Sequence, residues 1–174
     1  MKVNIKDLLK QQTSTPLVIM MCGVAGSGKT TFAQQVEKEG FIRLSIDEEI
    51  WKVNGRYGID YPAQSYGDYQ IEAEKRLRNQ LIRLIQEKQK VVIDFSFWQK
   101  RKRDDYKELI EEAGGEWKLI YVKVSPEIIR KRLEIRNKRF DANAAFPITD
   151  EILTSYLNGF EVPSNEREII IEPT

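Results

Sequence analysis

Continuous apolar runs alternate along the chain with stretches in which apolar residues recur at helical spacing. Leu17–Cys22 is the longest continuous run, and Val91–Ile93 is a shorter one. Such runs are typical of strands that are buried on both faces of a sheet. Further strands are predicted at Phe41–Ile46, at Trp117–Val124 and, near the end of the chain, at Ile169–Ile171.

Helices are predicted between these strands. The leucines at positions 77, 81 and 84 recur every three to four residues, which predicts a long helix at about Gln70–Lys88. Shorter helices are predicted at Lys29–Glu39, 48–53 and Asp104–Ala113, and after the capping sequences Ser125-Pro126-Glu127 and Thr149-Asp150-Glu151. Strands and helices that alternate in this order predict a parallel α/β sheet covered on both faces.

Two segments do not fit the alternation. Residues 1–15 are predicted to form an amino-terminal extension, with a short amphipathic turn around Ile5 and Leu8 and a polar linker from Gln11 to Thr15. Residues 54–69 are rich in glycine and tyrosine and are predicted to form a loop excursion.

Composition limits the chemistry that the chain can perform. It has 174 residues, 41% hydrophobic and 32% charged, which is typical of one folded domain spanning 1–174. It contains no histidine and one cysteine, Cys22. A histidine base, a Ser-His-Asp triad, a disulfide framework and a cysteine–histidine zinc site are therefore excluded. Acid–base chemistry would have to come from carboxylates, lysine, tyrosine or cysteine.

Charge and hydropathy indicate the compartment and the partners. The net charge of +1 predicts no general attraction to nucleic acid or to a membrane surface. The longest apolar run, Leu17–Cys22, is far shorter than the roughly 18 residues of a membrane span. The amino-terminal sequence lacks the features of a signal peptide, and a single cysteine suits a reducing environment. We therefore expect a cytoplasmic protein, either a monomer or a homodimer.

The clearest motif follows the first predicted strand and opens the first long helix. Gly23-Val24-Ala25-Gly26-Ser27-Gly28-Lys29-Thr30 matches G-x-x-x-x-G-K-[ST] at every fixed position. Glycines let the backbone fold around phosphate oxygens, and the amides of the loop and the helix start then face the anion. Lys29 is expected to reach the β- and γ-phosphates, and the Thr30 hydroxyl is expected to bind Mg²⁺. Thr31 completes the predicted nucleotide-binding set.

Other classes of nucleotide-binding protein fit less well. A GTPase would need a glycine after the Walker B aspartate, but Asp94 is followed by Phe95-Ser96-Phe97. The guanine-reading Asn-Lys-x-Asp motif and a transporter signature are also missing. A chain of this length leaves little room for the helical lid of a ring-forming ATPase, and the third glycine of a Rossmann fingerprint is absent.

The remaining pattern resembles the small phosphate-loop kinases related to chloramphenicol phosphotransferase, zeta toxins and bacterial polynucleotide kinases. It comprises the Walker A motif, Ser45-Ile46-Asp47 after the second strand, Val91–Asp94 at the third, and arginines in the helix after the fourth. The resemblance implies a three-layer sandwich whose five-stranded parallel sheet has the order 2-3-1-4-5. It also implies an arginine-bearing lid, placed at 130–147.

The resemblance assigns roles to individual residues. It makes Asp47 the general base and Asp94 a ligand of Mg²⁺, either directly or through water. It makes Arg132 and Arg136 lid arginines that neutralise the transferring phosphoryl group, with Arg132 also contacting the nucleotide. Arg139 shares their helical face and is a third candidate. The alternatives without a catalytic role are that Asp47 only caps a helix and that the arginines lie on a solvated basic helix.

The acceptor is less well defined by the sequence. Residues 51–69 are expected to bind it, and the predicted substrate residues are Asp47, Arg56, Tyr57, Trp98 and Arg103. Arg103 could instead pair with Asp104 or Asp105. Polynucleotide kinases carry an arginine where this chain has Ile50, so a nucleic-acid acceptor is not expected.

The sequence therefore predicts an ATP- and Mg²⁺-dependent kinase that phosphorylates a hydroxyl of a small molecule. The alternatives are a nucleotide or polynucleotide 5′-kinase, a zeta-toxin-like nucleotide-sugar kinase, and an ATP-binding regulatory module with little transfer activity.

Overall fold

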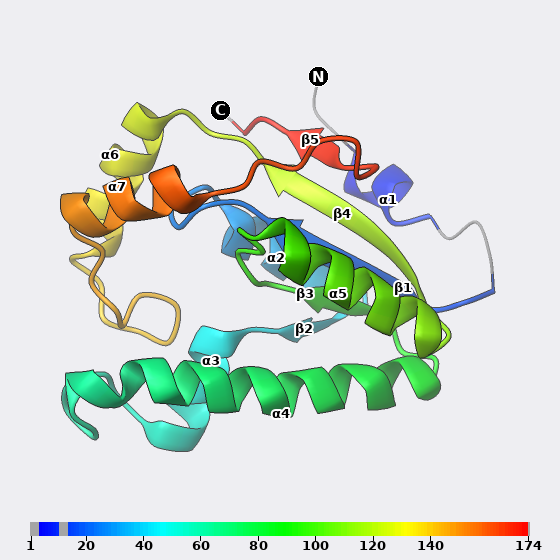
Figure 1. Ribbon diagram of the computed structural model, residues 1–174, viewed down its shortest axis with the longest axis horizontal. Coiled ribbons are helices and arrows are strands. Elements are labelled where there is room, and N and C mark those ends of the chain that lie inside the picture. Colours follow the sequence, from blue (N-terminus) through cyan, green and yellow to red (C-terminus); the bar gives the residue numbers. More distant parts are fainter. Residues whose placement is uncertain (1–3, 11–13, 174) are drawn as a thin grey trace.

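A computed structural model describes residues 4–10 and 14–173 (Figure 1). The strands are β1 Leu17–Cys22, β2 Ile42–Leu44, β3 Val91–Ile93, β4 Glu116–Val122 and β5 Ile169–Ile171. The helices are α1 Ile5–Leu8, α2 Lys29–Lys38, α3 Ile46–Asn54, α4 Tyr66–Gln86, α5 Lys100–Glu112, α6 Pro126–Arg136 and α7 Asp150–Gly159, with a short 3-10 helix η1 Ala63–Ser65. No helix within these described ranges is long and apolar enough to cross a membrane.

The strands form one parallel sheet with β1 in the middle. Its order is β2-β3-β1-β4-β5, and every neighbouring pair is parallel. This confirms the predicted order. The carboxyl ends of parallel strands lie at one edge of a sheet, and in α/β folds that edge is where ligands bind.

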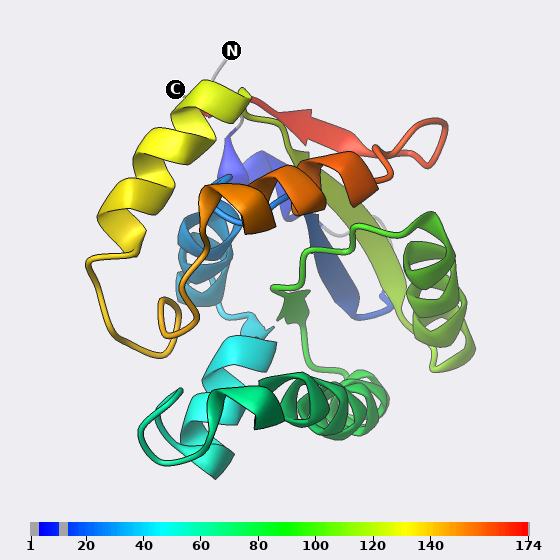
Figure 2. The same cartoon turned by 60° about the vertical axis from the view of Figure 1, so that its left-hand side comes forward.

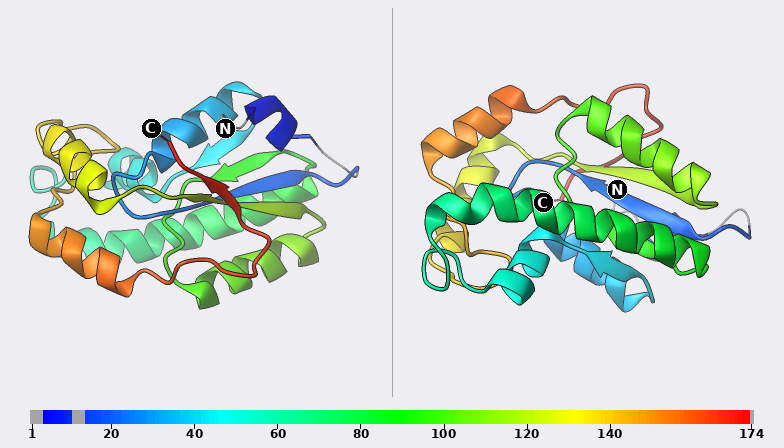
Figure 3. Two further views of the ribbon diagram at one scale, coloured as in Figure 1. Left: turned by 90° about the horizontal axis from the view of Figure 1, so that it is seen from above. Right: turned by 60° about the horizontal axis from the view of Figure 1, so that its bottom comes forward.

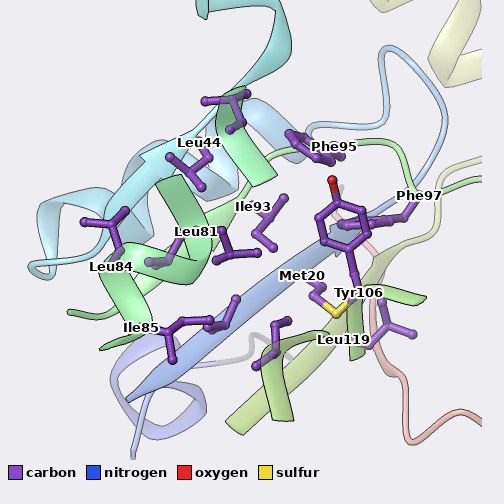
Figure 4. Close-up of a cluster of buried hydrophobic side chains, with 14 of the residues drawn as sticks. Met20, Leu44, Leu81, Leu84, Ile85, Ile93, Phe95, Phe97, Tyr106 and Leu119 are labelled. Carbon is purple, nitrogen blue, oxygen red and sulfur yellow. The ribbon is translucent and has the colours of Figure 1, made fainter. Parts of the chain in front are cut away.

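The six residues of β1 are fully buried because helices cover both faces of the sheet. Side chains of a strand point alternately to the two faces. Val18, Met20 and Cys22 accordingly pack with α4 and α5, a cluster shown in Figure 4. Leu17, Ile19 and Met21 pack with α1 and α2 in a second cluster. Figure 3 shows the resulting layers.

A third cluster joins α6 and α7 to the loop after β1. Val24 packs there with Ile129 and Leu133 of α6 and with Leu153 of α7. Gly26 lies directly under α6, since a Cβ at that position would come within 3.1 Å of the Leu133 side chain. The segment 137–149, which joins α6 to α7, runs toward α3 and the start of α4 (Figure 2). We refer to this segment as the lid loop.

Some element boundaries differ from those predicted. The helix predicted at 48–53 is longer, because the Ser45 hydroxyl caps it by accepting a hydrogen bond from the Glu48 amide (3.3 Å). Asp47 therefore lies in the first turn and is not the cap. The long helix α4 begins at Tyr66, so the predicted loop ends earlier than expected. Residues 11–13 of the predicted linker lie outside the described residues.

Candidate phosphate-transfer site

The phosphate loop joins β1 to α2 at the carboxyl edge of the sheet. Gly26 and Gly28 have φ angles of +81° and +102°, a left-handed conformation that suits glycine. The amide of Gly23 donates to the carbonyl of Ser96 (3.0 Å), which fixes the loop to the segment after β3. No side chain caps α2. The amides in the first turn of a helix and its positive dipole end suit an anion, so the start of α2 is a candidate phosphate-binding site.

Two polar side chains of the loop are placed to bind a phosphate. Lys29 Nζ donates to the carbonyl of Val24 (3.0 Å), which folds the lysine back over the loop. Burial lowers the pKa of Lys29, while the charges of Asp94 and Asp47 act in the opposite direction. The Ser27 hydroxyl is buried and has no hydrogen-bond partner within the described residues. A buried polar atom without a partner is costly and is typical of a ligand site.

Asp47 lies at the same edge, on the first turn of α3. Its Oδ1 accepts a hydrogen bond from the hydroxyl of Tyr66 (3.1 Å). Burial raises the pKa of Asp47, whereas the Tyr66 hydrogen bond and the charges of Arg136 and Lys29 lower it. A raised pKa makes this carboxylate more basic than an ordinary aspartate, which suits it to accept a proton.

Asp94 follows β3 and is held by an arginine that sequence reasoning missed. Arg43 Nε and Nη2 both donate to Oδ2 of Asp94, at 3.1 and 2.9 Å. The Arg43 and Asp94 side chains are only 2% and 3% exposed. Arg43 also donates to Glu48 (2.7 Å) and to the side chain of Asn143 in the lid loop (2.8 Å).

The residues predicted to bind Mg²⁺ fit that ion only together with a nucleotide. Within the described residues, no three His, Cys, Asp or Glu side chains are grouped closely enough to hold a metal ion. Mg²⁺ usually takes one or two protein ligands and completes its shell with phosphate oxygens and water. Thr30 and Asp94 suit this arrangement, since Arg43 Nε and Nη2 both donate to Oδ2 of Asp94, and Oδ1 has no hydrogen-bond partner among the described residues.

The predicted lid arginines lie at different places. Arg132 Nη1 donates to the carbonyl of Ser27 (2.9 Å) and so lies directly on the phosphate loop. Arg136 donates to the carbonyls of Phe146 (2.8 Å) and Asn143 (3.1 Å), and its charge acts on Asp47. Arg139 is exposed and pairs with Asp141 (2.8 Å). The structure thus brings Arg132 and Arg136, but not Arg139, to the loop and to Asp47.

The excursion after α3 brings a group of aromatic rings next to Asp47. The Tyr57 ring lies edge-on to Tyr66 and to Phe146 of the lid loop, with centroid distances of 5.4 Å in both cases. Arg56 is exposed and pairs with Asp60 (3.0 Å), so its charge is already balanced. Trp98 is 45% exposed and packs near Gly159, at the end of α7.

Arg103 does not join the predicted substrate-binding residues. Its side chain is fully buried, and Nε and Nη2 each donate to a different oxygen of Glu166 at 2.9 Å. Its Nη1 donates to the carbonyl of Phe97 (2.8 Å). Arg103 pairs with neither Asp104 nor Asp105. Its partner is Glu166, which the segment between α7 and β5 brings over α5. In this structure Arg103 has no surface to offer a substrate.

Several residues near Asp47 had no sequence signal. Tyr156 of α7 is one, since burial and the Asp47 charge raise its pKa while the Arg136 charge lowers it. Arg43 and Asn143 are others, because they meet through a contact between segments distant in the sequence. Tyr66 lies in the predicted acceptor-binding segment 51–69, but its hydrogen bond to Asp47 had no sequence signal.

Comparison with known proteins places the chain in a family. A UPF0200 protein of Pyrobaculum aerophilum, PAE1629, is 29% identical over 125 residues, which span 71% of this chain and 68% of that protein. A candidate kinase of Chloroflexus aurantiacus superposes with a TM-score of 0.69 at 16% identity, covering 91% of this chain and 85% of that one. A gluconokinase of Sinorhizobium meliloti superposes with a TM-score of 0.60 at 16% identity, covering 91% and 83%. These structures share the fold of the chain, a P-loop kinase-like sandwich. Residues 18–163 match the AAA domain family, and the chain belongs to that family.

Proposed function

We propose that this protein is an ATP- and Mg²⁺-dependent kinase that transfers the γ-phosphate to a hydroxyl of a small molecule. The observation that carries the proposal is the placement of Asp47, a half-buried carboxylate, within electrostatic range of the phosphate-loop lysine, Lys29. A phosphate loop alone would support binding of a nucleotide. A carboxylate base beside it supports transfer of the phosphoryl group to an alcohol.

Each residue then has a defined task. The amides of the phosphate loop and Lys29 hold the β- and γ-phosphates, and Arg132 and Arg136 offset the charge of the transferring group. Thr30 and Asp94 would hold Mg²⁺, which supplies further neutralisation of phosphate charge when bound. The oxygen of the acceptor hydroxyl bonds to the γ-phosphorus, and Asp47 accepts the proton of that hydroxyl. The bond from that phosphorus to the β–γ bridging oxygen breaks, and ADP leaves.

The surroundings of Asp47 favour a small and largely uncharged acceptor. The rings of Tyr57, Tyr66 and Phe146 offer apolar faces, and Arg56 is neutralised by Asp60. Ile50 is buried and offers no charge for a nucleic-acid phosphate.

The buried free thiol of Cys22 suits the reducing cytoplasm.

The test is a screen for transfer of labelled γ-phosphate from ATP to sugars, antibiotics, nucleosides and short oligonucleotides. We expect a labelled alcohol among the small molecules, and labelling of oligonucleotides alone would contradict the proposed acceptor class. Asp47→Asn should retain ATP binding and lose transfer by about 100-fold or more. Asp105→Asn, which changes an exposed aspartate that pairs with Arg78 on α4, is the matched control and should transfer normally. Normal turnover of Asp47→Asn would remove Asp47 as the base.

A further inference from the structure

The hydroxyl of Tyr66 occupies a position on Asp47 that matters for the proposed reaction. It donates to Asp47 Oδ1 at 3.1 Å, which is the hydrogen bond that the hydroxyl of an acceptor would make to a general base. Tyr66 is the first residue of α4, and Asp47 lies in the first turn of α3. The contact therefore depends on how the two helices pack, and the two helices contact each other extensively.

The lid loop holds the Tyr66 ring in this position. Phe146 stacks on the Tyr66 ring with a centroid distance of 4.9 Å and an angle of 9° between the rings. Tyr57, which follows α3, packs edge-on against the same ring. Arg136 fixes Phe146 by donating to its carbonyl (2.8 Å). Figure 2 shows the lid loop reaching toward α3 and the start of α4. The phenol is therefore placed by both the excursion and the lid loop.

The hydroxyl also remains a donor. Burial and the neighbouring Asp47 charge raise the pKa of Tyr66, so the phenol keeps its proton and the carboxylate keeps its partner. A kinase whose base is free in the absence of its acceptor would deprotonate water and waste ATP. In that side reaction a water oxygen bonds to the γ-phosphorus, the bond to the β–γ bridging oxygen breaks, and the water proton passes to Asp47.

We propose that Tyr66 is a positioning residue that takes the place of the acceptor hydroxyl on Asp47 and thereby suppresses hydrolysis of ATP. This inference rests on the proposed function, because it assumes that Asp47 is the base. An acceptor must displace the phenol from Asp47 to react. Water, which makes no stacking contact with Phe146 or Tyr57, displaces it poorly.

The experiment measures release of inorganic phosphate from Mg-ATP with no acceptor present. Tyr66→Phe removes the hydroxyl and keeps the ring that stacks on Phe146, so we expect hydrolysis to rise about tenfold or more. The matched control is Tyr106→Phe, which loses a hydrogen bond of the same kind, to Glu74 (3.0 Å), away from the site. We expect Tyr106→Phe to hydrolyse ATP at the rate of the unchanged protein. Adding Asp47→Asn to Tyr66→Phe should remove the increase.

The outcomes separate this inference from the proposed function. An unchanged or lower rate in Tyr66→Phe overturns the role of Tyr66, and a thermal shift with Mg-ATP in the same sample shows whether nucleotide binding stands. An equal rise in Tyr106→Phe also overturns it, because the effect would then reflect general loosening. Loss of nucleotide binding by the unchanged protein would instead contradict the proposed function itself.

Discussion

Two buried arginines hold carboxylates in this protein, and they do so in different ways. Arg103 uses Nε and Nη2 to bond separate oxygens of Glu166, and Lys107 bonds one of these oxygens as well (3.0 Å). Arg43 directs its Nε and Nη2 to the same oxygen of Asp94. Both arginine side chains are almost fully buried.

The difference separates a saturated carboxylate from one that is a candidate for a ligand. Both oxygens of Glu166 are saturated by protein donors, so this carboxylate has no capacity for a ligand and serves to attach the segment after α7 to α5. Asp94 lies at the end of β3, within electrostatic range of Lys29, and its Oδ1 has no hydrogen-bond partner in the part of the chain that the structure describes. The number of donors on the carboxylate, and not the burial of its arginine, is what separates the two pairs.

The largest expected effect comes from removing the saturated carboxylate. Glu166→Ala leaves Arg103 and Lys107 buried without a counter-charge, which should lower the free energy of unfolding by about 3–5 kcal/mol. Urea unfolding measures this change. The fraction that remains folded should bind Mg-ATP as tightly as the unchanged protein, and a selective loss of nucleotide binding would show that the pair belongs to the site.

Removing Arg43 should lower the free energy of unfolding by less than removing Glu166 does. Arg43→Met leaves a buried Asp94 without its donor, and we expect a loss of about 2 kcal/mol in urea unfolding. The double variant with Asp94→Asn should recover part of that loss, because the unpaired charge is then gone. Full additivity of the two changes would contradict a direct coupling of Arg43 to Asp94.

Acid should weaken the Glu166 pair in a defined window of pH. The Arg103 and Lys107 partners lower the pKa of Glu166 from 4.5 to about 2, against the opposing effect of burial. A depressed pKa stabilises the fold above pH 4.5, and this contribution is lost as the pH falls toward about 2. Relative to Glu166→Gln, the protein should lose about 0.8 kcal/mol between pH 7 and pH 4 in urea unfolding. A constant difference between the two proteins would contradict the shift.

The smallest effect is expected at an exposed arginine. Arg139 pairs with Asp141 at the surface, and its side chain is 56% exposed. Arg139→Ala should change the free energy of unfolding by about 0.5 kcal/mol or less. In a transfer assay it should retain activity, whereas Arg136→Ala should lose most of it. A large loss of transfer activity in Arg139→Ala would instead make Arg139 the arginine that acts in transfer.

The sequence predicted the parts of the molecule that depend on neighbouring residues. The phosphate loop is contiguous in the sequence, and buried strands such as β1 are continuous apolar runs, so both are visible in one window. The start of α3 was misplaced because capping by Ser45 is a matter of one hydrogen bond. The energy of one capping hydrogen bond is small, yet it can decide at which residue a helix begins.

The missed features depend on contacts between distant residues. Arg103 and Glu166 are 63 positions apart, and Arg43 and Asp94 are 51 apart. Nothing in the sequence around Arg103 distinguishes a buried structural arginine from one that binds a substrate. The role of Tyr66 is hidden for the same reason, since its hydroxyl reaches Asp47 only after α3 and α4 pack.

The thermal stability of the protein with and without Mg-ATP tests directly whether the phosphate loop binds the nucleotide whose γ-phosphate is transferred. Binding to the folded state alone should raise the melting temperature, and the rise should grow with the logarithm of the ratio of ligand concentration to Kd. We expect a clear rise for the unchanged protein and none for Lys29→Ala. An equal rise in both proteins, or no rise in either, would contradict binding of the nucleotide at the phosphate loop.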